Sequence, residues 1–194
     1  MLRHSSTALR ITIVSVLLLG LIYPLVMTGI AQALFPRQAN GSLVTVDGKV
    51  VGSWIVGQLW TKPQYFQGRP SAAGKGYDPT STGGTNLGPA SAKLIKATQA
   101  TIAQLEKDNP GASGPPPMDL VTSSASGIDP DISPEAAYWE APRVANARHI
   151  SLTSVRALVA AHVAGRQFGF LGEPHVNVLE LNLALDGLHP QERP

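Results

Sequence analysis

The longest apolar run in the chain extends from Ile11 to Phe35, ITIVSVLLLGLIYPLVMTGIAQALF, and contains no charged residue. It exceeds the ~20 residues that an α-helix needs to cross the hydrocarbon core of a bilayer. Its few polar residues are scattered instead of gathered on one face, which argues against a core helix of a soluble protein. The run therefore predicts a membrane-spanning helix.

The flanks of this helix bear on its processing and orientation. Ala31-Gln32-Ala33 resembles a signal-peptidase site, but the apolar region of a cleaved signal has only ~7–15 residues, so an uncleaved anchor is favoured. Arg3 and Arg10 precede the run, and the positive-inside tendency places that end in the cytoplasm. The predicted topology is a single pass through the cell inner membrane, with a cytoplasmic N-terminus (residues 1–10), a transmembrane helix (11–35) and an extracytoplasmic domain (36–194).

Small and helix-perturbing residues lie inside the apolar run. Pro24 lacks a backbone N–H and is expected to kink the helix. Gly20, Thr28 and Gly29 offer small surfaces against which a helix of a membrane partner can pack. The anchor is therefore expected to contact a protein helix as well as membrane lipid.

Three shorter patterns follow the anchor. SLVTVDGKVVGSWIVGQ predicts two short strands joined at Asp47-Gly48, a pair suited to the positive φ angles of a tight hairpin turn. Apolar residues recur at helical spacing from Ala90 to Asp108 and predict a helix. MDLVTSS, from Met118 to Ser124, predicts another strand.

Two helices are predicted further along the chain. Ser133 is suited to cap the first of them, and Pro142 is expected to bend or restart it. The second begins at Ser151 or Thr153 and is expected to stop at Gly165.

Alternating leucines in the last pattern, VNVLELNLAL (residues 176–185), favour a half-buried strand, and a short helix at its end stays open. The chain of 194 residues is too short for two comfortable domains. The mixed order of helices and strands predicts an α+β fold, with one mixed domain after a single N-terminal transmembrane helix.

Composition narrows the classes of function. The net charge is +2 and the cationic residues are dispersed, so nucleic acid is not an expected partner. Cysteine is absent, which excludes disulfides and thiolate chemistry. The chain has no GxSxG elbow, HExxH motif or Ser-x-x-K spacing. No catalytic residue and no metal ligand is therefore predicted.

One alternative class stays open, a freestanding membrane-anchored envelope hydrolase. Asp129 and Asp131 flank Pro130 and could act as acid and base, although turn chemistry accounts for them equally well. A Ser-Lys peptidase assembled by the fold, for which Ser91 and Lys93 lack the usual spacing, would be the other form of this class.

The remaining arginines and histidines are expected to be structural, because arginines near carbonyl and acidic groups commonly tie loops together. The residues concerned are Arg69, Arg143, Arg148 and Arg166, and His149, His162, His175 and His189.

A glycine-rich stretch from Phe66 to Ser91 matches a phosphate-binding loop only in part. Such a loop needs a glycine, four spacer residues and then Gly-Lys-Ser/Thr. Here Gly68 and Gly74 enclose five residues, and Lys75 is followed by Gly76. An ordered loop with tight turns is therefore favoured over a nucleotide site.

Five segments together resemble the C subunit of the Kdp potassium-transporting P-type ATPase: FQGRPSA, GGTNLGP, DLVTSSASGIDPDISPEAA, PRVANAR and GRQFGFLGEPHVNVLELNLALD. With the N-terminal anchor, the resemblance covers nearly the whole chain in a consistent order. The chain departs from the family pattern at Glu140, where that pattern often has glutamine.

The resemblance implies a noncatalytic subunit of an inner-membrane complex that couples ATP hydrolysis to potassium uptake. The family is described as a catalytic chaperone that raises the ATP affinity of the hydrolysing B subunit, through which ATP is mainly bound. The A subunit supplies the potassium path, and a small F subunit completes the complex. Potassium is the transported ion of the complex and not a ligand of this chain.

An extracytoplasmic domain cannot touch cytoplasmic ATP, so its effect on ATP affinity would be a coupling free energy carried through the complex. We expect the anchor to pack against the channel-like subunit and the domain to cap the potassium entrance. If the domain were cytoplasmic instead, the glycine-rich loop from Phe66 to Ser91 could bind ATP directly. The residues expected in this partner- or nucleotide-associated loop are Gly68, Arg69, Pro70, Lys75, Gly83, Gly84, Asn86, Gly88 and Pro89.

Overall fold

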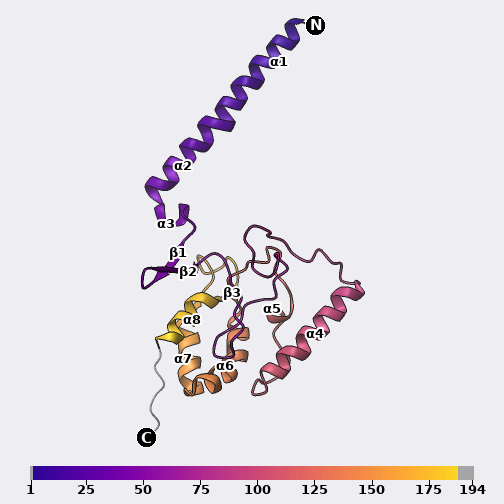
Figure 1. Ribbon diagram of the computed structural model, residues 1–194, viewed down its shortest axis with the longest axis vertical. Coiled ribbons are helices and arrows are strands. Elements are labelled where there is room, and N and C mark those ends of the chain that lie inside the picture. Colours follow the sequence, from indigo (N-terminus) through magenta and orange to yellow (C-terminus); the bar gives the residue numbers. More distant parts are fainter. Residues whose placement is uncertain (1, 188–194) are drawn as a thin grey trace.

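A long helix projects from the folded part of the computed structural model, which describes residues 2–187 (Figure 1). The helix runs through α1 Leu2–Ser15, the π-helical segment η1 Val16–Ile22 and α2 Tyr23–Leu34. Within the described part of the chain, His4–Leu34 is the one helix long and apolar enough to cross a membrane. The predicted apolar helix is thus confirmed, and it begins nearer the N-terminus than the apolar run.

Pro24 is the second residue after the π-helical segment and does not end the helix. A proline ring crowds the carbonyl four residues earlier, which here is that of Gly20. The wider π turn gives this carbonyl more room. The perturbation expected at Pro24 therefore takes the form of a π-helical turn within a continuous helix. Gly29 has no neighbouring atom within 4 Å of its Cβ position, which leaves space for a partner.

A short turn and a hairpin follow the long helix. Helix α3 Pro36–Ala39 leads into β1 Leu43–Val46, which pairs antiparallel with β2 Lys49–Ser53. At the turn, Asp47 and Gly48 have φ angles of 48° and 76°. The predicted Asp-Gly hairpin is therefore confirmed.

The second sheet has three short strands in the order β3–β5–β4, and both pairs of neighbours are antiparallel. The strands are β3 Asp131–Ile132, β4 Val163–Ala164 and β5 His175–Asn177. Three helices gather around this sheet (Figure 1): α6 Pro134–Arg148, α7 Leu152–Ala161 and α8 Val178–Asp186. The largest fully buried apolar side chains of this core are Phe66, Val144, Val155, Val159, Val176, Leu181 and Leu185.

Helix α4 Ala92–Asp108 lies to one side of these helices (Figure 1) and buries only Leu105. Ser91 caps it, which confirms the predicted helix to within two residues. The Ser133 cap of α6 and the Ser151 cap of α7 are confirmed as well.

The strand predicted over Met118–Ser124 is wrong, because this segment contains the short helix α5 Met118–Val121. The Asp119 carboxylate accepts hydrogen bonds from the N–H (2.6 Å) and the hydroxyl (3.1 Å) of Ser133. The adjacent side chains of Leu120 and Val121 are both buried, whereas a half-buried strand would alternate between its two faces.

Two helix boundaries also differ from the prediction. Helix α6 continues through Pro142 without a break, because packing of its buried face outweighs the lost backbone hydrogen bond. Helix α7 ends at Ala161 instead of Gly165, since Val163 and Ala164 pair with β5.

The predicted strand over residues 176–185 is mostly helix. Only its first two residues belong to β5, and α8 begins at Val178. The Asn177 side chain accepts a hydrogen bond from the Glu180 N–H (3.1 Å) and so caps the helix. The α+β class with an N-terminal apolar helix is confirmed despite these local corrections.

Candidate functional site

The glycine-rich loop begins at Phe66, whose side chain is fully buried. The Phe66 N–H donates to Asn182 Oδ1 of α8 (2.8 Å), and Asn182 Nδ2 donates to the Phe66 carbonyl (2.9 Å). Asparagine carries both a donor and an acceptor, so it pairs with both polar groups of one residue's backbone. Asn182 is itself fully buried and fixes the start of the loop to α8.

The next residue is tied to a buried ion pair of α6. The Gln67 N–H donates to Glu140 Oε2 (3.0 Å), and Arg143 Nη2 donates to Glu140 Oε1 (2.5 Å). The side chains of Arg143 and Glu140 are only 5% and 0% exposed. Such a pair is tolerated in a core only when its remaining hydrogen-bonding groups are also occupied, and Gln67 occupies one of them.

The same arginine and a neighbour hold the segment that leads into the loop. Arg143 Nη1 donates to the carbonyls of Pro63 (2.6 Å) and Tyr65 (2.8 Å), and Arg148 Nε donates to that of Gln64 (2.7 Å). The Arg148 guanidinium also lies 4.9 Å from the centre of the Tyr65 ring. Both arginines therefore tie a loop together, as predicted.

Arg69 is the third arginine that links the loop to the rest of the domain. Its Nη1 lies 3.0 Å from Asp129 Oδ2, and its Nε and Nη2 each lie 3.4 Å from the Thr122 carbonyl oxygen. The Tyr77 hydroxyl donates to the Arg69 carbonyl (2.6 Å). Burial, with the Asp129 carboxylate adding to it, raises the pKa of Tyr77 to about 12. A Cβ at Gly68 would collide with the Tyr77 hydroxyl, so this position requires glycine.

The middle of the loop packs onto the segment before β3. Ser71 Oγ donates to the Gly127 carbonyl (2.5 Å) and accepts from the Tyr77 N–H (2.7 Å). The Gly83 N–H donates to the Ser126 carbonyl (2.8 Å). Gly127 has a φ of +71°, and a Cβ there would lie 2.6 Å from the Gly83 oxygen. The loop and this segment are thus in backbone contact.

The structure separates the nine predicted loop residues into two groups. Gly68, Arg69, Gly83 and Gly84 contact the rest of the domain, and Pro70 lines a pocket. The others are exposed to solvent: Lys75, Asn86, Gly88 and Pro89. The second group is the more exposed of the two, and the first group is half-buried.

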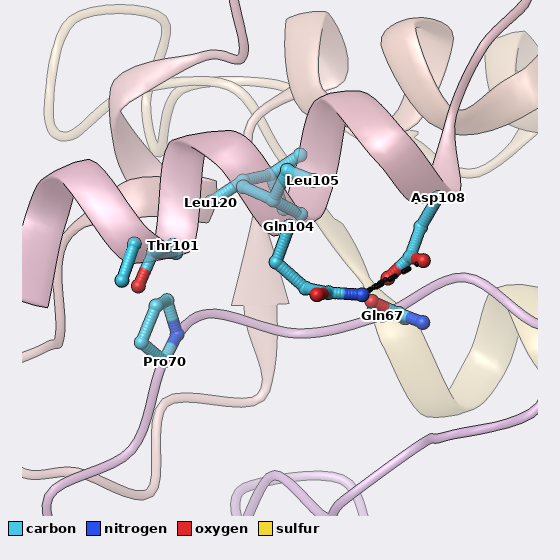
Figure 2. A pocket seen from close by; sticks show the side chains of 8 residues that line it. Gln67, Pro70, Thr101, Gln104, Leu105, Asp108 and Leu120 are labelled. Atoms are coloured by element: carbon cyan, nitrogen blue, oxygen red, sulfur yellow. Dashed lines mark hydrogen bonds between the residues drawn. The ribbon is translucent and has the colours of Figure 1, made fainter.

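A pocket of about 390 Å³ lies between the start of the loop and α4 (Figure 2). Gln67 and Pro70 line its loop side, and Thr101, Gln104 and Asp108 line its helix side. Gln104 Nε2 donates to both oxygens of the Asp108 carboxylate, at 2.8 and 2.9 Å. The pocket offers amide, hydroxyl and carboxylate groups beside the loop, and it has room for a small polar group.

Comparison with known proteins identifies the family. The model of the family described as "KdpC: K+-transporting ATPase, c chain" matches residues 5–187. The potassium-transporting ATPase KdpC subunit of Acidobacterium capsulatum is 53% identical over 188 residues, covering 97% of this chain and 100% of the relative. The KdpC subunit of Koribacter versatilis is 49% identical over 195 residues, covering 100% of both chains. The KdpC subunit of Myxococcus xanthus is 56% identical over 181 residues, covering 93% of this chain and 86% of the relative.

The chain belongs to the KdpC family. The match extends from the N-terminal apolar helix to α8, so the resemblance seen in the sequence motifs is confirmed over the whole folded chain.

The carboxylates considered for hydrolysis have structural partners in this KdpC chain. Asp129 accepts hydrogen bonds from the Asp131 N–H (3.1 Å) and from Arg69, while Asp131 accepts from Asn177 Nδ2 (3.0 Å). Burial raises the pKa of Asp131, and the hydrogen bond from Asn177 partly opposes this rise. Ser91, the serine of the Ser-Lys alternative, caps α4. Turn and capping chemistry therefore accounts for these residues.

His149, His162 and Arg166 match their structural interpretation. His149 is the left-handed C-cap of α6, and His162 caps α7 and lies 2.8 Å from the Leu158 carbonyl through Nδ1. Arg166 pairs with Glu173 on the surface. His175 lies in β5, and His189 lies outside the described residues. Between residues 2 and 187, no three potential metal ligands gather.

Sequence reasoning missed the buried groups that position the loop, above all Asn182 and Glu140. One signal was present in the sequence. Asn182 follows Val178 by four residues and precedes Leu185 by three, so on a helix it shares their buried face. A polar residue on such a face needs a partner, and Phe66 supplies it.

Protonation of Glu140 should make stability depend on pH. Burial raises the pKa of Glu140 from 4.5 to about 7, although the Arg143 guanidinium opposes the rise. The folded state therefore binds this proton more tightly than the unfolded chain. The contribution to the free energy of unfolding is fully present below pH 4.5 and is lost as the pH rises to about 7.

We expect Glu140→Gln to remove this dependence. Between these pH values, the difference in unfolding free energy between wild type and variant should change by up to about 3 kcal/mol, with wild type relatively more stable at low pH. Denaturant unfolding of the full chain in detergent measures it. Exposed Glu173→Gln is the matched control. Parallel pH profiles of wild type and Glu140→Gln would show that folding does not raise the pKa of Glu140.

Proposed function

We propose that this KdpC-family chain is a noncatalytic accessory subunit that stabilises a potassium-transporting ATPase complex and raises the ATP affinity of the hydrolysing B subunit. The observation that best supports this role is the commitment of the candidate arginines to internal ion pairs. The pairs are Arg69–Asp129, Arg143–Glu140, Arg148–Asp186 and Arg166–Glu173. With Arg69 paired, exposed Lys75 is the one cation of the Phe66–Ser91 loop outside these pairs, and a single ammonium holds a nucleotide phosphate less firmly than several converging charged groups. ATP would therefore be held mainly by the B subunit.

The route of this effect follows from the proposed topology. The anchor crosses the inner membrane with its N-terminus in the cytoplasm and the folded part outside. It packs against the channel-like A subunit through its small residues, which are Gly20, Thr28 and Gly29 next to Pro24, and a small F subunit completes the complex. The exposed residues Lys75, Asn86, Gly88 and Pro89 face the partner or the potassium entrance. The effect on ATP is then a coupling free energy, typically ~1–3 kcal/mol.

Kinetics of the purified complex test this role. Omission of the chain should raise the KM for ATP by roughly 5- to 150-fold, the range that such coupling energies give. A triple variant, Lys75→Ala, Asn86→Gly and Pro89→Ala, in which glycine tolerates the positive φ of residue 86, should shift the apparent potassium affinity or weaken assembly. It leaves the internal contacts of the loop in place. Exposed Lys107→Ala on α4 is the control. Unchanged assembly and kinetics in the triple variant would exclude the loop as a contact.

Two simpler measurements test the remaining parts of the proposal. Protease added to spheroplasts, in which the outer membrane is opened, and to lysed spheroplasts distinguishes an extracytoplasmic domain, cut in both, from a cytoplasmic one, cut only after lysis. Turnover of a peptide or ester substrate by the chain alone would support the hydrolase alternative. Potassium-stimulated ATP hydrolysis that requires the whole complex would support the subunit.

A further inference from the structure

A pair of side chains ties the last turns of the membrane helix to the chain that follows it. Gln32 Nε2 donates to Asn40 Oδ1 (3.3 Å), and Asn40 Nδ2 donates to Gln32 Oε1 (3.2 Å). Asn40 Nδ2 also lies 2.6 Å from the Pro36 carbonyl oxygen. Gln32 belongs to the uncharged run that predicts the membrane span. Asn40, three residues before β1, therefore lies at the depth of the last turns of the membrane helix.

The second strand of the hairpin is tied to the same place. Ser53 Oγ donates to the Gly41 carbonyl (2.6 Å), and the Trp54 N–H donates to the Ser42 carbonyl (3.1 Å). Both ends of the β1–β2 hairpin thus meet directly beside the end of the anchor, as Figure 1 shows for α3, β1 and β2. An uncharged helical run of about 25 residues at 1.5 Å each spans ~37 Å, a little more than a ~30 Å hydrocarbon core. The hairpin therefore starts within the headgroup layer.

Apolar side chains on this hairpin and just after it are exposed. Leu43, Val50 and Ile55 are 54%, 61% and 59% exposed, and they line a shallow pocket of about 410 Å³. Further exposed apolar side chains of this stretch are Val46, Val51 and Leu59. Clustered exposed aliphatic residues mark a surface that meets protein or membrane.

We propose that the β1–β2 hairpin lies in the interfacial layer of the bilayer, with Leu43, Val50 and Ile55 in contact with lipid. The position of the hairpin beside the end of the anchor favours lipid. Exposed Arg37 precedes the hairpin, and exposed Lys49 follows its turn. Both side chains can contact lipid phosphates there. The folded part is then held against the membrane by more than its tether. This inference depends on the membrane anchor and not on the proposed role in ATP affinity.

Site-directed fluorescence tests this contact, and the absence of native cysteine makes the labelling specific. Full chains carrying Val50→Cys or Ile55→Cys are labelled with an environment-sensitive dye and placed in nanodiscs of phosphatidylcholine and phosphatidylglycerol. Lys107→Cys is the control, because the C-terminal end of α4 lies far from the anchor (Figure 1). We expect blue-shifted emission, loss of fluorescence with brominated lipid and protection from aqueous iodide at residues 50 and 55, but not at residue 107.

Two results would overturn the proposal. Iodide quenching at residues 50 and 55 equal to that at residue 107 would show that the hairpin stays in water. Labels that iodide reaches in the single chain, but that neither quencher reaches in the assembled ATPase complex, would assign the surface to a protein partner. Because every measurement on the single chain is made without the other subunits, failure of the proposed function leaves this test intact.

Discussion

Replacing Arg143 with methionine is expected to lower the free energy of unfolding by about 3–5 kcal/mol, the usual effect of breaking a buried ion pair. The guanidinium donates to Glu140, to Asn109 Oδ1 (2.8 Å) and to the carbonyls of Pro63 and Tyr65. Methionine fills much of the same space but donates no hydrogen bond. Without the counter-charge of Arg143, the pKa of buried Glu140 would rise further, so the stability lost in the variant should grow as the pH rises. Denaturant unfolding of the full chain in detergent measures the change.

The matched control is Arg166→Met. Arg166 also pairs with a glutamate, but its side chain is 43% exposed and that of Glu173 is 76% exposed, so the loss should stay below about 1 kcal/mol. A double variant, Glu140→Leu with Arg143→Met, should regain part of the stability, because no unpaired charge remains buried. Equal effects of Arg143→Met and Arg166→Met would mean that the ion pair of α6 does not hold the start of the glycine-rich loop in place.

Elements with strong local signals were predictable. The N-terminal apolar helix is marked by its length and composition, the hairpin by Asp47-Gly48 with its positive φ angles, and α6 by its Ser133 cap. Each of these depends on residues adjacent in sequence. A cap or a turn fixes its own backbone, whatever packs against it later.

The errors arose where tertiary contacts decide between two local possibilities. The alternating leucines of residues 176–185 fit a strand, but Asn177 and Glu180 have the spacing of a helix cap and its third residue. Val163 and Ala164 are not helical, because they form strand β4 and pair with β5. Periodicity alone does not contain such pairings.

The candidate site shows the same division. Its glycines and tight turns could be predicted from the sequence of the loop, and Lys75, Asn86, Gly88 and Pro89 are exposed as expected of an ordered surface loop. The groups that hold the loop could not, because Asn182 lies 116 residues from Phe66 and Glu140 lies 73 residues from Gln67. The sequence shows which residues are polar, but their backbone hydrogen-bond partners are known only from the fold.

The second large effect is expected from Asn182→Leu, which should lower the free energy of unfolding by about 4 kcal/mol. Leucine fits an apolar core but leaves the N–H and the carbonyl of Phe66 buried without partners, at roughly 1–3 kcal/mol each. Asn146→Leu on the exposed side of α6 is the control, and its effect should stay within about 0.5 kcal/mol. Thermal or denaturant unfolding of the full chain in detergent compares them.

Asn182→Asp separates hydrogen bonding from packing at this position. An ionised aspartate accepts from the Phe66 N–H, but it also places a buried charge against the Phe66 carbonyl. A protonated aspartate has one donor and one acceptor, like the amide it replaces. Burial favours this neutral form, so the stability lost in Asn182→Asp should be regained as the pH falls, whereas that lost in Asn182→Leu should not. Equal deficits of the two variants at every pH would mean that Asn182 acts through shape alone, and the pairing with Phe66 would then not be what anchors the loop.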